Sequence, residues 1–277
     1  MSSLDDRGKI SARLHREGEQ PHALGEPILV VDKLSRSFGG LKAVNGFSFD
    51  VRRRSITSLI GPNGAGKTTA FNAVTGVIPP TSGSVRFQGQ ELAGRRPDQI
   101  CRLGIARTFQ NIRLFDDQSV LDNVMVGLHR RLKAGLLGGL LRFPAAPEEA
   151  EARAAAAHYL DFVGLLPRLA DEAGSLAYGE RRRLEIARAL ASEPELLLLD
   201  EPAAGMNPQE TVELVELIRR IQAAGITVFL IEHDMKLVME ISDTIYVLDH
   251  GEEIARGDPA SVRSNEQVIK AYLGVPE

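Results

Sequence analysis

The segment at residues 61–69, "GPNGAGKTT", constrains this chain more than any other feature of its sequence. It fits the pattern G-x-x-x-x-G-K-[ST], follows a β-branched apolar run that ends at Ile60, and precedes a stretch with helical spacing. Glycines in such a loop let successive backbone N–H groups face a chain of phosphates at a helix N-terminus, where the helix dipole also favours anions. The segment therefore predicts a nucleotide-binding loop between a strand and a helix.

Two side chains of this glycine loop carry specific expectations. Lys67 is expected to pair with the β- and γ-phosphates, and the Thr68 hydroxyl is expected to ligate Mg²⁺. The alternative is a glycine turn that matches by chance, which at an average glycine content of about 7% happens in on the order of one chain in a hundred. The residues predicted to contact ATP are Gly61, Pro62, Asn63, Gly64, Ala65, Gly66, Lys67, Thr68 and Thr69.

A second motif, "LLLLDEP", places two carboxylates at the end of an apolar strand. Asp200 is expected to hold the Mg²⁺ ion, and Glu201 is expected to polarise the attacking water as general base. The alternative is an ordinary charge pair at the N-terminus of a helix. The nucleotide loop upstream favours the catalytic interpretation.

Two further polar residues follow predicted strands. Gln110, in "RTFQN", is positioned in the sequence to orient water or to ligate Mg²⁺, and His233, in "IEHDM", to contact the γ-phosphate. Taken alone, each is more often an ordinary polar residue of a loop or of a core edge. Their catalytic interpretation depends on the other motifs.

Composition bounds the function further. An apolar content of 43% in 277 residues suits a globular chain with a full core, and 33 Lys and Arg against 37 Asp and Glu argue against a general polyanion binder, so no nucleic-acid partner is expected. A single cysteine, Cys101, excludes an internal disulfide framework. No run approaches the roughly 20 apolar residues that span a bilayer.

The order of patterns predicts an α/β fold. Buried apolar strands alternate with helices, which implies a mainly parallel sheet covered on both faces. Residues from about 112 to 175 are expected to form a helical insertion, and residues 1–27 a mobile tail. The segments expected to be strands include "ILVVDKLSRSF", "FSFDVRRRSITSLIG", the pair "GSVRFQGQEL", "ELLLLD", "ITVFLIE" and the hairpin "DTIYVLDHGEEIARG".

The motifs together resemble a known family. "GPNGAGKTT", "RTFQN", "LAYGERRRLEIARAL", "LLLLDEP" and "IEHD" occur in the order, and at roughly the spacing, of the ATP-binding-cassette (ABC) ATPases, over about residues 28–277. The resemblance implies a P-loop NTPase core with a mainly parallel sheet, an antiparallel β subdomain and a helical subdomain at about 112–175. It also implies that Phe38 stacks on adenine.

In that family two nucleotide-binding domains dimerise head to tail. The resemblance therefore implies that a signature segment (residues 177–180) contacts ATP held by the partner protomer, through Ala177, Tyr178, Gly179 and Glu180. The family usually has Ser where this chain has Ala177, so we expect a weakened contact. It usually has Asp where this chain has Asn207, which puts a charged contact between protomers at that loop in doubt.

Longer segments resemble a narrower group. "RTFQNIRLFDDQSVLDNVMVG", "DEPAAGMNP", "IEHDMKLVMEISDTIYVLDHG" and "VIKAYLG" are similar to the ATP-binding subunit of branched-chain amino-acid importers. This implies ATP-driven uptake through transmembrane permease subunits, a second ATP-binding subunit that is identical or different, a periplasmic solute-binding protein acting indirectly, and a peripheral place at the cytoplasmic face of the inner membrane. The alternatives are a cassette for another solute or for lipid export, and a soluble ABC ATPase that acts on DNA or ribosomes.

Basic residues occur in two clusters. In "LAYGERRRLEIARAL" we expect Leu184, Ala187 and Leu190 to face the domain, and the arginines to form a mostly solvated face with Glu185 as a helical neighbour. Gly179 is then expected to matter far more for hydrolysis than Arg182. A second cluster either approaches lipid headgroups or forms a solvated amphipathic loop; its members are Arg130, Arg131, Lys133 and Arg142.

Overall fold

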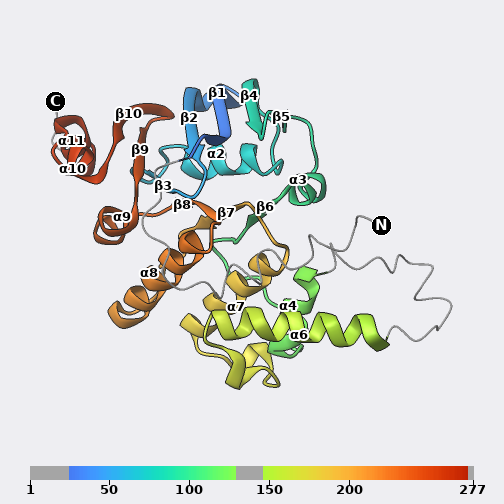
Figure 1. Ribbon diagram of the computed structural model, residues 1–277. Coiled ribbons are helices and arrows are strands. Elements are labelled where there is room, and N and C mark those ends of the chain that lie inside the picture. The colour runs from blue at the N-terminus through green and yellow to red at the C-terminus, as the bar shows by residue number, and fades with distance from the viewer. Residues whose placement is uncertain (1–24, 129–145, 274–277) are drawn as a thin grey trace.

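The computed structural model describes residues 25–128 and 146–273 (Figure 1). The second basic cluster lies outside these residues. The expected tail also lies outside them, apart from its last three residues, and the first strand already begins at Pro27. Within the described part of the chain, no helix has both the length and the apolar character needed to cross a membrane.

The central sheet has six strands in the order β10-β9-β3-β8-β7-β6. All neighbouring strands are parallel except the β9–β10 hairpin, which confirms the predicted mainly parallel sheet. The three strands β3, β7 and β8 are buried along their whole length, because helices cover both faces of the sheet. The bounds are β3 Ile56–Ile60, β6 Ile105–Arg107, β7 Leu196–Asp200, β8 Thr227–Ile231, β9 Thr244–Asp249 and β10 Glu252–Gly257.

A separate antiparallel sheet lies above this layer in Figure 1, with helix α2 (Lys67–Val74) between the two. Its strand order is β2-β1-β4-β5. The rings of Phe71 on α2 and Phe229 on β8 lie 4.7 Å apart, and Phe49 from β2 contacts Phe229 at 5.2 Å, so one aromatic cluster joins the sheets to the helix. The bounds are β1 Pro27–Phe38, β2 Leu41–Arg52, β4 Ser82–Phe87 and β5 Gln90–Glu91.

The interpretation of "FSFDVRRRSITSLIG" as one strand is wrong. The segment contains the end of β2 and all of β3, which belong to different sheets. The chain turns between them, and Arg54 has a φ of +60°, a left-handed conformation that interrupts a strand. Adjacent arginines at this turn remain near solvent, whereas the residues of β3 enter the core.

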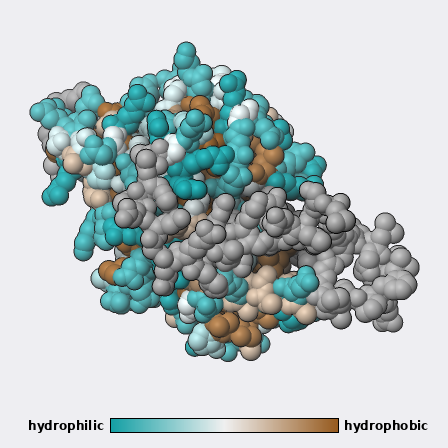
Figure 2. All heavy atoms as spheres, viewed as in Figure 1, coloured by the Kyte–Doolittle hydropathy of each residue, from teal (hydrophilic) through white to brown (hydrophobic). Residues whose placement is uncertain are grey.

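The helices of the lower layer form a group of their own. Helices α4 (Val120–Leu128), α6 (Ala146–Phe162) and α7 (Tyr178–Ala191) pack on one another around one apolar core (Figure 1). Two of them lie in the range predicted as a helical insertion, and α7 comes from beyond it. Figure 2 shows hydrophilic residues over most of the antiparallel-sheet end and apolar patches toward this helical end.

The remaining helices flank the central sheet. Helix α3 and strand β6 did not follow from the sequence, because "PDQICRLGIAR" is too short for either period to show. Helices α8 and α9 follow the motif "LLLLDEP" and His233, respectively, and continue the predicted alternation of strands and helices. The bounds are α3 Pro97–Leu103, α8 Pro208–Ala223, α9 Met235–Ile241, α10 Pro259–Arg263 and α11 Glu266–Leu273, with single 3₁₀ turns at Leu166–Arg168 and Ala173–Ser175.

Candidate functional site

Four parallel strands, β3, β6, β7 and β8, end at the same edge of the sheet, where ligands of such sheets bind. The glycine loop (residues 61–69) follows β3 and leads into α2. Gly66, at the N-cap, has a φ of +102°, and no side chain caps the first N–H groups of the helix. A Cβ at Gly66 would overlap the carbonyl oxygen of Ala43 on β2, so the loop and β2 are in close backbone contact.

Lys67 is buried, and its Nζ donates hydrogen bonds to the carbonyl oxygens of Gly61 at 2.7 Å and Pro62 at 2.9 Å. Burial lowers the pKa of the Lys67 ammonium, and the nearby carboxylates of Glu201 and Asp200 oppose this shift. The cation therefore faces the interior of the loop on one side and two negative charges on the other.

Asp200, the last residue of β7, is paired with a buried arginine that sequence reasoning missed. Arg107 Nη2 lies 2.6 Å from Asp200 Oδ2, and both side chains are less than a tenth exposed. The same guanidinium donates through Nη1 to Asn72 Oδ1 at 2.7 Å and to Thr75 Oγ1 at 3.0 Å. Arg107 thus joins the predicted metal ligand to the helix that follows the glycine loop.

The three predicted catalytic residues meet at one carboxylate. Gln110 Nε2 donates to Glu201 Oε2 at 2.8 Å, and His233 Nδ1 lies 3.8 Å from the same oxygen. They come from the ends of β6, β7 and β8, and the exposed faces of Gln110 and His233 leave the group open to solvent. Glu201 has a φ of +45°, a strained value for a non-glycine residue that is common at functional sites.

Glu232, an acidic residue that sequence reasoning missed, binds the backbone next to this group. Glu232 is fully buried and accepts backbone N–H groups from Ala203 at 2.8 Å and from His233 at 3.0 Å. Burial raises the pKa of Glu232, and the N–H groups that it accepts oppose the shift. Its place directly after an apolar strand, next to His233, was the available signal.

The signature segment forms the start of α7. Ala177 occupies the N-cap and has no side-chain acceptor, while its own N–H donates to the Glu180 carboxylate at 3.0 Å. Tyr178 Oη donates to the carbonyl oxygen of Ala204 at 2.8 Å. Among the described residues, no hydrogen bond or ion pair joins this segment to the glycine loop of the same chain.

The structure also shows the surroundings of two other positions singled out in the sequence, Phe38 and Asn207. Phe38 is 46% exposed at the end of β1, with the Arg36 guanidinium 4.6 Å from the ring centroid, so much of the ring remains accessible. Asn207 is the N-cap of α8: its Oδ1 accepts the N–H of Glu210 at 3.0 Å. An amide at this position therefore has a structural role within the chain.

The expectation that the three arginines form a solvated face is wrong for Arg182. Its side chain is fully buried with Glu185, whereas Arg181 pairs with Asp116 at 2.7 Å and Arg183 lies 3.6 Å from Glu213. Consecutive helix residues point about 100° apart, so three neighbours cannot share one face. The predicted apolar stripe is confirmed, since all three members are fully buried: Leu184, Ala187 and Leu190.

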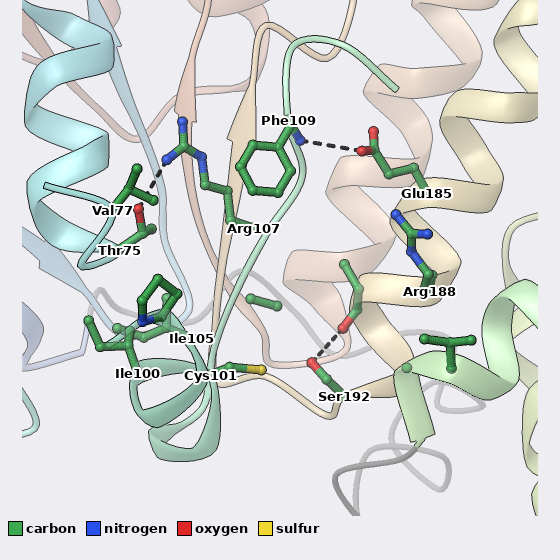
Figure 3. Close-up of a pocket in the computed structure, with 15 residues that line it drawn as sticks. Thr75, Val77, Ile100, Cys101, Ile105, Arg107, Phe109, Glu185, Arg188 and Ser192 are labelled. Carbon is green, nitrogen blue, oxygen red and sulfur yellow. Dashed lines mark hydrogen bonds between the residues drawn. The ribbon is translucent and has the colours of Figure 1, made fainter. Parts of the chain in front are cut away.

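A cavity of about 410 Å³ opens between β6 and the helices α3, α4 and α7 (Figure 3). Its wall is mainly apolar and includes Val77, Ile100 and Val126. Two residues of the Gln110 loop (residues 107–110), Arg107 and Phe109, also line it, together with the charged Glu185 and Arg188 of α7. The cavity therefore lies beside the segment that carries Gln110 and away from the mouth of the glycine loop.

Comparison with known proteins agrees with this arrangement. Residues 44–204 match the profile of the family described as ABC transporter, and residues 252–277 match one described as branched-chain amino acid ATP-binding cassette transporter. The chain belongs to the ABC transporter family. It is 51% identical, over 91% of its length and 99% of the relative's, to the high-affinity branched-chain amino acid transport ATP-binding protein LivG of Salmonella typhimurium.

Other relatives give the same result. The corresponding protein BraF of Pseudomonas aeruginosa is 49% identical over 91% of this chain and 99% of its own. A solved structure of an ATP-binding cassette of an ABC transporter in its ADP conformation superposes with a TM-score of 0.80 at 31% identity, and covers 90% of this chain and 100% of its own. The predicted ABC ATPase fold is confirmed, and the chain is an ATP-binding, ATP-hydrolysing cassette.

Proposed function

We propose that this chain is the ATP-hydrolysing subunit of an importer that takes up branched-chain amino acids through separate transmembrane permease subunits. The observation that carries the hydrolytic part is the meeting of Gln110, Glu201 and His233 at one carboxylate oxygen beside the glycine loop. The solute is supported by the relatives' names and by the match of residues 252–277.

The residues of the site fit a nucleoside triphosphate. Uncapped N–H groups at the start of α2, a close backbone approach at Gly66 and a buried Lys67 provide donors and charge for phosphates. Thr68, Asp200 and Gln110 offer a hydroxyl, a carboxylate and a carboxamide, the oxygen ligands that Mg²⁺ prefers. When bound, Mg²⁺ neutralises charge that develops on the phosphates.

Within that site each side chain has a distinct task. Glu201 accepts the proton of the attacking water, and Gln110, which donates to the Glu201 carboxylate, orients that water. His233, near the same carboxylate, contacts the γ-phosphate. Arg107 keeps Asp200 in place relative to α2, and Glu232 keeps the backbone of Ala203 and His233 in place. Phe38 offers a half-exposed ring for adenine.

Hydrolysis requires a second cassette, identical to this chain or different from it. The signature segment then contacts the nucleotide of the partner, through backbone N–H groups at the start of α7 and with Ala177 adding no hydroxyl. Bound ATP stabilises the closed pair because it interacts with both halves. Opening and closing of the pair move the permease subunits.

The permease subunits are expected to dock on the helical subdomain, proposed at about residues 112–175 with α7 packed against it. The cavity beside the Gln110 loop (Figure 3) gives this face a mainly apolar recess next to the catalytic group. Such docking places the chain at the cytoplasmic face of the inner membrane. A periplasmic solute-binding protein delivers the amino acid from the other side.

Replacing Glu201 with Gln tests the hydrolytic assignment. Loss of a general base is expected to lower the hydrolysis rate about 10²- to 10⁴-fold, while ATP binding is retained and a closed dimer accumulates. E240Q, which changes an exposed glutamate of α9, is the matched control and should hydrolyse ATP like the unchanged chain. An unaltered rate in E201Q would remove Glu201 from the role of base.

Vesicles that contain the complete transporter test the solute. Leucine, isoleucine and valine should be taken up in an ATP-dependent way, and urea or other small solutes should not. Purification should also recover the membrane subunits together with this chain. If the protein instead purifies alone and its ATPase rate rises with nucleic acid, the transport proposal is wrong.

A further inference from the structure

Arg182 is the largest fully buried side chain among the described residues, and it binds the backbone of the Gln110 loop. Its Nη1 donates to the carbonyl oxygen of Phe109 at 2.8 Å, and its Nη2 donates to the carbonyl oxygen of Gln110 at 2.9 Å. The same Nη1 lies 2.8 Å from Glu185 Oε2. Glu185 Oε1 accepts the Phe109 N–H at 3.4 Å, a contact visible in Figure 3.

These contacts occur where the loop leaves the central sheet. Strand β6 ends at Arg107, and the N–H of Thr108 still donates to the carbonyl oxygen of Leu198 on β7 at 3.0 Å. From Phe109 onward the backbone has no strand beside it, and its buried polar groups need partners from elsewhere. Helix α7 supplies both a donor group and an acceptor group to this short stretch.

Simple packing of α7 against the loop does not call for an ion pair. Burying two charges has a large desolvation cost, and apolar residues of similar volume often hold two elements together equally well or better. Arg182 and Glu185 differ from apolar side chains in forming directional hydrogen bonds, because a planar guanidinium and a carboxylate fix the positions of the groups they bind. The groups fixed here are the carbonyl of Gln110, whose side chain contacts Glu201, and both backbone polar groups of the preceding Phe109.

We propose that Arg182 and Glu185 are positioning residues that make Gln110 and helix α7 move as one unit. The inference rests on the proposed function, because α7 begins with the signature segment. Arg182 lies one helical turn after Tyr178, so a shift of α7 on contact with the partner's nucleotide is passed to the Gln110 backbone. The shift thereby reaches the Gln110–Glu201 contact, which lies in this chain's own nucleotide site.

The arginine run offers a matched control for the experiment. Arg183 is the next residue of the same helix, is partly exposed and lies 3.6 Å from Glu213. R182M is expected to lower kcat for ATP about 10- to 100-fold, because misplacing a catalytic group by about 1 Å has an effect of this size. The KM for ATP should change by less than about threefold, and R183M should leave both constants within about twofold.

A double-mutant cycle separates positioning from general stability. If Arg182 acts through Gln110, R182M should lower kcat by less than about threefold further once Gln110 is already Ala. Equal effects of R182M in the two backgrounds would overturn the inference, as would an R182M variant with the kcat of the unchanged chain. Failure of the proposed function would give a different result. The transporter would then take up no branched-chain amino acids, although the double-mutant cycle of Arg182 and Gln110 could still show the expected coupling.

Milder variants cover the case in which R182M does not fold. E185Q retains the shape of Glu185 but loses one of its two acceptor oxygens, and R182K retains the charge but cannot serve both carbonyls. In an E201Q background, which needs no hydrolysis, ATP should slow hydrogen exchange in residues 105–112 and 176–186 together. In R182K or E185Q protection of residues 176–186, which contact the partner's nucleotide directly, should be retained, and protection of residues 105–112 should be reduced; unchanged protection of both would overturn the inference.

Discussion

The glycine loop and the Gln110 loop approach the same pair of carboxylates, yet they are held in place in different ways. The glycine loop owes its shape to its own residues, with left-handed glycines at positions 64 and 66 and a lysine that bonds back to the carbonyls of Gly61 and Pro62. The Gln110 loop owes its shape to contacts with other elements. Arg182 and Glu185 bind its backbone from α7, and its own Arg107 binds Asp200 and α2.

The difference implies that the glycine loop is rigid and that the Gln110 loop moves with the elements that hold it. A loop determined by its own residues keeps its shape when distant elements shift, which suits a phosphate-binding cradle. A loop held by buried ion pairs follows the elements that hold it, which suits a residue whose position reports on the partner protomer. Three substitutions test this contrast, in decreasing order of expected effect.

The largest effect is expected for R107M. Removing one partner of a buried ion pair leaves Asp200 uncompensated, and the free energy of unfolding should fall by about 3–5 kcal/mol. R53M is the control, since the Arg53–Glu195 pair has a similar 2.8 Å contact but both side chains are more than 40% exposed; its cost should be at most about 1 kcal/mol. Urea unfolding followed by circular dichroism measures both, because the chain has no tryptophan. Equal costs would contradict the contrast.

An intermediate effect is expected for G66A. The new Cβ would meet the Ala43 carbonyl in addition to occupying a left-handed conformation, so affinity for a fluorescent ATP analogue should fall at least about 100-fold. G64A is the control within the same loop, because its Cβ would enter open space and only the conformational cost of about 1–2 kcal/mol remains. Comparable losses in the two variants would show that the left-handed conformation of the glycines alone, without the contact to β2, accounts for the need for glycine at position 66.

The smallest effect is a pH dependence. Burial raises the pKa of Glu185, so the folded chain binds this proton more tightly than the unfolded chain does. The resulting contribution to stability is fully present below the ordinary pKa of about 4.3 and is lost as the pH rises through the folded pKa. E185Q has no proton to titrate at this position, so the stability of the unchanged chain relative to E185Q should fall with rising pH.

The slope of that difference cannot exceed about 1.4 kcal/mol per pH unit for one group. Urea unfolding at several pH values between about 4 and 7 measures it. E213Q removes the same charge from a partly exposed residue that contacts Arg183, and it controls for net charge. A difference that stays constant or rises with pH would show that Glu185 is not held in a desolvated environment.

Most strands and most long helices could be predicted, because their apolar residues recur at the period of one element. Strand β7 and helix α8 are examples, with "LLLLD" buried throughout and a cap at Asn207. Helix α3 and strand β6 could not be, since each is too short to show a period. The strand pattern across Arg53 and Arg54 misled because the residues on both sides are strand-like while the turn between them is not.

Some residues of the candidate site could likewise be predicted from the sequence and others could not. The glycine loop, Asp200, Glu201, Gln110 and His233 could be singled out because each lies directly after an apolar strand, where parallel strands gather their ends. Arg107 and Glu232 also end or follow strands, which was the available signal, but the adjacent residues do not show that these two side chains are buried. Their burial depends on neighbours from β7 and α2, and on the backbone of residues 203 and 233.

The amino-acid order by itself determined the phosphate-binding loop, since the conformations of its glycines and the charge of its lysine are properties of the segment. It also determined which face of α7 is apolar. Only the tertiary structure decided which of three adjacent arginines is buried. Arg181, Arg182 and Arg183 are chemically identical, and the packing of α7 against the Gln110 loop distinguishes them: Arg181 meets Asp116, Arg183 meets Glu213, and Arg182 alone meets backbone carbonyls that have left the sheet.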